Sequence, residues 1–166
     1  MLKAAIIGCG AIAPLHAEAV KSSSGGELAV VVDIEEEKAK SSAHRYGCEF
    51  STDYREVLLD SQIDVVHICT PHYLHYDMAC AALSHGKHVL IEKPMAMNYA
   101  QAEEIWRLAQ GVQKHCAVAF QNRFSPQVVR AKEILESGEL GDIFGIRGSV
   151  NWFRDAAYYR QGEWRG

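Results

Sequence analysis

Residues 4–13, with the sequence Ala-Ala-Ile-Ile-Gly-Cys-Gly-Ala-Ile-Ala, decide the fold. The first four are apolar, which is typical of a strand that is buried on both faces. The next six match the pattern G-x-G-x-x-G/A, in which glycines allow a tight turn and the close approach of a pyrophosphate. A helical pattern follows over residues 11–20, so the anion would lie at a helix N-terminus. The residues expected at this turn are Gly8, Cys9, Gly10, Ala11 and Ile12.

Short apolar runs alternate with helical patterns up to about residue 121. Helix starts are indicated by capping-box spacings, Asp53 with Glu56 and Asn98 with Gln101. Strands that alternate with helices form right-handed crossovers, so the strands are parallel and helices cover both faces. The sequence therefore predicts an α/β domain over residues 1–121, a doubly wound parallel sheet of the Rossmann type. The predicted strands are 4–7, 28–32, 65–68, 89–91 and 117–120.

Asp33 closes the second apolar run about 20 residues after the glycine turn, the usual place of the acid that binds the adenosine ribose. A carboxylate there accepts hydrogen bonds from the ribose hydroxyls and repels a 2′-phosphate. Residues 35–37 are all glutamates and add like charge. We therefore expect the cofactor to be NAD, with NADP less favoured. The alternative is that Asp33 only caps the following helix.

The pattern changes after residue 121. Ser125-Pro126 predicts a helix start, and Gly138 predicts its end. From 143 to 153 apolar and polar residues alternate, which indicates a strand with one buried face. A single strand needs sheet neighbours, so residues 122–166 are expected to begin an incomplete α+β second domain with a helix and a strand. The alternative is that this strand extends the first sheet.

The bulk composition excludes several classes of protein. The chain has 166 residues, a formal net charge of -4 and 48% hydrophobic residues. Acidic and basic residues are interspersed, so we expect no nucleic-acid partner. No apolar segment is long enough for a membrane span, and the five scattered cysteines contain no Cys-x-x-Cys pair. These features favour a cytoplasmic location. The exposed edge of the strand at 143–153 suggests a homo-oligomer formed through it.

Four short motifs together resemble the glucose–fructose oxidoreductase/inositol dehydrogenase (Gfo/Idh/MocA) family over the entire chain. They are Cys-Thr-Pro-His at 69–72 followed by His75, Glu-Lys-Pro at 92–94, Gln-Asn-Arg-Phe at 121–124, and the stretch 159–166. The resemblance implies an NAD(P)-dependent oxidoreductase that moves a hydride between the nicotinamide and a hydroxyl carbon of a sugar or polyol.

Lys93 is the expected catalytic residue. It directly follows a predicted strand, at the sheet edge where ligands bind, and Pro94 favours an extended backbone at Lys93. The resemblance implies that Lys93 exchanges a proton with the substrate hydroxyl during hydride transfer. The alternative for an arbitrary lysine is a solvated surface position.

The remaining site residues come from the resemblance. Glu92 is expected to orient Lys93 or to contact the nicotinamide end, and His75 either lies by the cofactor or packs in the core. His16 also matches a family position, although a helix histidine is more often structural. Trp164 and Arg165 are candidates to fold back toward the cofactor. No carboxylate or cysteine set completes a metal site with the two histidines of 72–75. The cofactor contacts implied are Cys69, Thr70, Pro71, His72, His75, Glu92, Lys93, Asn122 and Arg123.

Family members carry a further substrate domain with an Asp-x-x-x-His motif, and residue 166 precedes that point. We therefore expect an N-terminal fragment that binds cofactor and turns over poorly alone. A rival interpretation is a non-catalytic nicotinamide-binding module with a redox-sensing or accessory role. Another is an oxidoreductase of similar build, such as a reductase of a conjugated pigment or a dehydrogenase of a diol.

Overall fold

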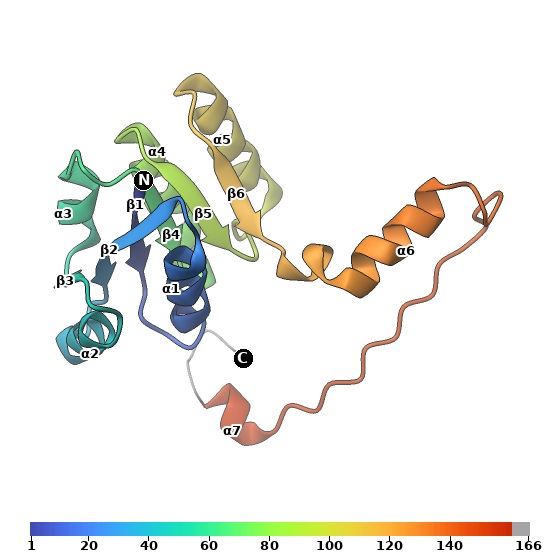
Figure 1. Cartoon of the computed structure of the whole chain (residues 1–166), viewed down its shortest axis with the longest axis horizontal. Helices are drawn as coiled ribbons and strands as arrows, with labels where there is room; N and C mark the ends of the chain where they lie inside the picture. The colour runs from blue at the N-terminus through green and yellow to red at the C-terminus, as the bar shows by residue number, and fades with distance from the viewer. Residues whose placement is uncertain (161–166) are drawn as a thin grey trace. The chain divides into compact units, whose positions relative to one another are not determined.

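The computed structural model describes residues 1–160, which divide into two compact units that begin at Met1 and at Phe120 (Figure 1). Within the described residues, the first unit holds one sheet of six parallel strands in the order β3-β2-β1-β4-β5-β6. This order is that of a doubly wound dinucleotide-binding fold, so the predicted fold class is confirmed. The strands are β1 (Leu2–Ile7), β2 (Gly26–Val32), β3 (Glu49–Ser51), β4 (Val65–Ile68), β5 (His88–Glu92) and β6 (Cys116–Ala119).

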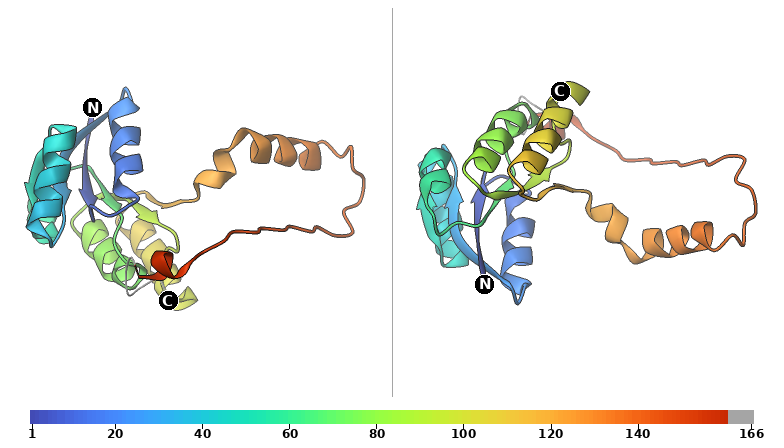
Figure 2. Two further views of the ribbon diagram at one scale, coloured as in Figure 1. Left: turned by 90° about the horizontal axis from the view of Figure 1, so that it is seen from below. Right: turned by 90° about the horizontal axis from the view of Figure 1, so that it is seen from above.

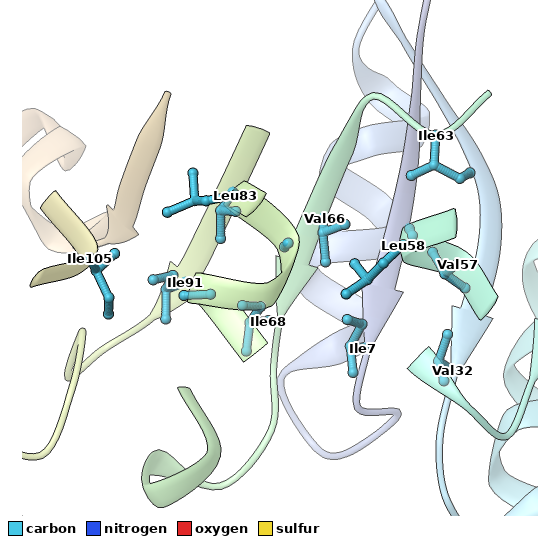
Figure 3. Close-up of a cluster of buried hydrophobic side chains, with 14 of the residues drawn as sticks. Ile7, Val32, Val57, Leu58, Ile63, Val66, Ile68, Leu83, Ile91 and Ile105 are labelled. Carbon is cyan, nitrogen blue, oxygen red and sulfur yellow. The ribbon is translucent and has the colours of Figure 1, made fainter. Parts of the chain in front are cut away.

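Helices cover both faces of the sheet, and strand and helix alternate along the first unit (Figure 2). One face packs against α1 (Ala13–Ser22) and α2 (Glu36–Tyr46). The other packs against α3 (Tyr54–Leu59), α4 (His75–Ser84) and α5 (Tyr99–Gly111). Figure 3 shows the second core, in which branched aliphatic side chains from strands and helices meet. Its largest fully buried members are Ile68, Leu83, Ile91, Ile105, Val32 and Val66.

Local signals explain where several helices begin. The Asn98 side chain accepts a hydrogen bond of 3.0 Å from the backbone N–H of Gln101, and the Gln101 side chain accepts one from Met97. Asp53 caps α3 by accepting from the N–H of Arg55 at 2.9 Å. These contacts satisfy backbone donors that the first helical turn leaves unpaired. The short edge strand β3 escaped the sequence prediction, because three residues, none of them buried, carry no periodic signal.

The second unit contains a 3₁₀ turn, η2 (Gln121–Phe124), and the helices α6 (Pro126–Glu136) and α7 (Ala156–Tyr159). The helix predicted from Ser125 is present, and the Ser125 hydroxyl caps it. The strand predicted over 143–153 is not formed, and between residues 120 and 160 the structure contains no strand. A strand needs a neighbour to pair its backbone groups. The side chains expected on its buried face are exposed, Phe144 at 98% and Ile146 at 83%.

No helix of the described residues is long and apolar enough to cross a membrane.

Candidate functional site

The glycine turn follows β1 at the carboxyl edge of the sheet. Gly8 has a φ of +96°, which L side chains rarely adopt, and a Cβ atom there would lie 2.8 Å from the carbonyl oxygen of Cys69. Gly8 also donates a hydrogen bond of 2.7 Å to the carbonyl of Val32. At Gly10 an added Cβ would meet no atom within 4 Å. The first glycine therefore lets two strand ends approach, and the second leaves space above the turn.

Asp33 is held by two backbone amides. Its Oδ2 accepts from the N–H of Cys9 at 2.8 Å, and its Oδ1 accepts from the N–H of Glu35 at 2.9 Å. The N-cap position of α2 is Glu35, whose side chain makes no capping hydrogen bond, so the alternative that Asp33 is the N-cap is wrong. Each carboxylate oxygen has a second lone pair, so the group can still accept from ribose hydroxyls. The acid and the glycine turn form one rigid unit.

The end of β4 continues into a 3₁₀ turn, η1 (His72–Leu74), and then α4. Thr70 and Pro71 are half-buried, and the Thr70 hydroxyl donates to the Met78 sulfur at 3.5 Å. The Cys69 side chain is buried, which raises the pKa of its thiol, and the Cys69 carbonyl lies against Gly8 of the turn. The rings of His72 and His75 lie 5.7 Å apart, centroid to centroid. Burial, together with His75 and Lys93, lowers the pKa of His72.

His75 is fully buried. Its Nδ1 lies 2.8 Å from the carbonyl oxygen of Pro94, and its Nε2 lies 2.9 Å from that of Thr70. A carbonyl oxygen only accepts, so the ring nitrogen of each bond that forms must carry a proton. These contacts favour the packing alternative for His75, because the side chain joins two loops and has no surface to offer a cofactor.

A buried network of polar side chains ends at Glu92, the last residue of β5. His16 Nε2 lies 3.0 Å from Glu92 Oε1, and their side chains are 8% and 11% exposed. His16 Nδ1 lies 3.1 Å from Nδ1 of His67, a residue of β4. Glu92 Oε2 accepts from the N–H of Lys93 at 3.2 Å, whereas Lys93 itself is exposed. From the sequence alone, His16 was treated as more often structural and His67 was not identified. The one signal of His67 is that a histidine lies inside an apolar strand.

We expect His67 to make the fold sensitive to acid. Burial, with the neighbouring His16, lowers the pKa of His67 from 6.5 to about 4. Between these two pKa values the unfolded chain binds a proton that the folded chain does not bind. The free energy of unfolding therefore falls as the pH drops from about 6.5 to about 4. Between about pH 7.5 and pH 4 we expect this group to lower the free energy of unfolding by roughly 3 kcal/mol. Urea unfolding of His67→Asn, which keeps a donor toward His16 and does not titrate, should show a shallower loss; an unchanged slope would contradict it.

The other predicted residues lie elsewhere. Asn122 and Arg123 are exposed residues of η2 in the second unit. Trp164 and Arg165 lie outside the described residues. Among residues 1–160 no group of three or more histidine, cysteine or acidic side chains is placed to hold a metal ion. The structure thus gathers the glycine turn, Asp33, residues 69–72 and the 92–94 segment along the carboxyl edge of one sheet.

Comparisons with known proteins agree with this geometry. Residues 2–120 match a family model (GFO_IDH_MocA) described as an oxidoreductase family with an NAD-binding Rossmann fold. Levoglucosan dehydrogenase of Pseudarthrobacter phenanthrenivorans is 36% identical over 129 residues, 76% of this chain and 33% of the relative. The chain spans between one third and one half of the length of the curated relatives that it matches.

Two solved structures extend the likeness to the backbone. The dehydrogenase WlbA of Chromobacterium violaceum, solved with NADH and UDP-GlcNAcA, is 30% identical with a TM-score of 0.95, covering 99% of this chain and 48% of that one. KijD10, a 3-ketoreductase of Actinomadura kijaniata, was solved with TDP-benzene and NADP as a Y186F mutant. It is 28% identical with a TM-score of 0.79, covering 86% of this chain and 42% of that one. Similar folds therefore bind either nicotinamide cofactor.

Proposed function

The chain belongs to the Gfo/Idh/MocA oxidoreductase family, and we propose that it serves an NAD-dependent dehydrogenase of a sugar or polyol. The observation that carries this proposal is the position of Lys93. The lysine follows β5 at the same carboxyl edge as the glycine turn and Asp33, and ligands of open parallel sheets bind outside that edge. A non-catalytic nicotinamide-binding module would need the turn and the acid but would have no use for Lys93.

The chemistry divides between cofactor and chain. When bound, the nicotinamide supplies the hydride acceptor or donor. The protein contributes Lys93. Its amine takes the proton of the substrate hydroxyl while the hydride leaves the carbon that bears this hydroxyl. The dinucleotide would lie over Gly8, Cys9 and Gly10, with the ribose at Asp33 and the nicotinamide half toward residues 69–72. The names of levoglucosan dehydrogenase and of WlbA with its sugar nucleotide support a carbohydrate substrate.

NAD is the proposed cofactor in preference to NADP. The Asp33 carboxylate is fixed by two amides, so it cannot turn away from a 2′-phosphate without losing both bonds. Exposed glutamates at residues 35–37 add to the repulsion. Fluorescence titration of the chain with NADH and NADPH is expected to give an NADH Kd that is lower by about tenfold or more, since like charges are juxtaposed.

Two variants sharpen this test. Asp33→Ser removes the repelling charge and is expected to bring the two dissociation constants closer together. Glu136→Gln removes an exposed charge of α6 that pairs with Lys132, away from residues 33–37 in the sequence, and it should leave their ratio nearly unchanged. Tighter binding of NADPH than of NADH by the unaltered chain would reject the preference, and binding of neither would reject the proposed function.

We further propose that residues 122–166 begin a substrate domain and that these 166 residues alone turn over slowly. In support, the matched residues make up only 44% and 33% of the length of two curated relatives. Exposed apolar side chains between 143 and 153, including Trp152 at 72%, also suit self-association through this segment.

A further inference from the structure

The backbone on each side of Lys93 is joined to a buried histidine, although Lys93 itself is exposed. On the N-terminal side is Glu92, which contacts His16 of α1. On the C-terminal side is Pro94, whose carbonyl contacts His75 of α4. The two histidines come from different helices on opposite faces of the sheet. Neither contact is one of the backbone hydrogen bonds that form the strands and helices.

The contact of His16 reaches Lys93 through one carboxylate. His16 Nε2 and Glu92 Oε1 are 3.0 Å apart, and the other carboxylate oxygen accepts from the Lys93 N–H at 3.2 Å. Behind His16, the ring of His67 is 3.1 Å away, nitrogen to nitrogen. A neutral His67 ring has one protonated and one free nitrogen and can present either to His16. The His16–Glu92 contact is therefore kept whichever charge His16 carries.

The contact of His75 reaches Lys93 from the other direction. His75 Nδ1 is 2.8 Å from the Pro94 carbonyl, and Nε2 is 2.9 Å from the Thr70 carbonyl. The same ring thus joins the loop after β5 to the loop after β4. Both loops end at the carboxyl edge, where the proposed cofactor would lie.

We propose that His16 and His75 are positioning residues. They hold the backbone before and after Lys93 in place, and so orient its exposed amine. This role rests on the proposed function of Lys93. Burying hydrogen-bonded polar side chains carries a desolvation cost that apolar packing does not, so stability alone does not account for the buried His16–Glu92 contact. A side chain that must meet a reacting atom needs such support, because misplacement by about 1 Å can cost 10²-fold in rate.

Matched amide substitutions test the proposal, because glutamine places its N–H near the Nε2 of histidine and asparagine near the Nδ1. At position 16 the bond to Glu92 uses Nε2, so His16→Gln should preserve the support and His16→Asn should not. At position 75 the bond to Pro94 uses Nδ1, so the order reverses: His75→Asn preserves and His75→Gln does not. Differences in size or general destabilisation do not produce this crossed pattern.

The measurement is hydrogen exchange at the backbone amide of Lys93, which donates to Glu92, followed by NMR. In the two preserving variants we expect rates within about threefold of the unaltered chain, and in the other two about tenfold faster exchange, because the loop opens locally. Equal rates for the asparagine and glutamine variants at either position would overturn the proposal. A crossed pattern in a chain that binds no NADH would instead reject the proposed function.

A second measurement does not depend on whether any variant folds. Nitrogen-15 spectra of the unaltered chain report which ring nitrogen carries the proton. We expect a proton on Nε2 of His16 and on Nδ1 of His75, since both face oxygen atoms that only accept. An unprotonated nitrogen at either place would overturn the proposal.

Discussion

Lys93→Ala is expected to lower kcat by about 10²- to 10⁴-fold while the Kd for NADH stays within about twofold. The alanine removes the amine that takes the hydroxyl proton, but it leaves the glycine turn and Asp33 untouched, because Lys93 makes its described contact through the backbone N–H. Turnover is measured on the catalytically complete protein by NADH absorbance with myo-inositol as the probe polyol. NADH binding is measured on the 166-residue chain.

Two further lysine substitutions make the result specific. Lys93→Arg keeps a positive charge but cannot release its proton, so kcat should remain low. Lys132→Ala removes an exposed lysine of α6 that pairs with Glu136, and it should leave kcat unchanged. Full activity of Lys93→Arg would show that Lys93 supplies charge and does not transfer a proton.

Gly8→Ala is expected to reduce the free energy of unfolding by at least about 2 kcal/mol, because an L residue is strained in this backbone conformation. The added methyl group would also lie 2.8 Å from the Cys69 carbonyl, which is backbone and moves only with β4. Thermal unfolding should show Tm lower by roughly 5 °C or more. NADH binding should weaken as well, since the turn and β4 would have to move apart.

Gly10→Ala is the matched control for this prediction. It adds the same methyl group, where no atom lies within 4 Å and the backbone is not left-handed. Its Tm should therefore stay within a few degrees of that of the unaltered chain, whereas NADH binding should weaken because the methyl group occupies the space proposed for the pyrophosphate. If both variants lost stability equally, the distinction between a folding glycine and a binding glycine would be wrong.

The fold could be predicted from residues 1–119 because its signals are local. An apolar strand, a glycine turn and capping side chains such as Asn98 act over a few neighbouring positions. The strand expected at 143–153 failed for the converse reason: its alternating pattern describes a face, but a partner strand must come from elsewhere. The three-residue edge strand β3 was missed because it is too short to show a period.

The candidate site could be predicted only in part. Lys93 and Asp33 were found because each follows a strand at a characteristic place. The contacts of His16 behind them were not predicted, because His16 is 51 residues from His67 and 76 residues from Glu92 along the chain. No spacing rule connects such positions, since β4 and β5 are neighbours only through the sheet order and His16 reaches them from helix α1.

The two amides that hold Asp33 have a consequence for how a dinucleotide would be recognised. Cys9 and Glu35 orient the carboxylate through contacts within the chain, so its rotamer is selected when the protein folds. The conformational entropy of that side chain is therefore lost during folding, and binding of the dinucleotide does not have to order it again. A preorganised acceptor of this kind raises affinity by lowering the cost of binding and without any additional contact.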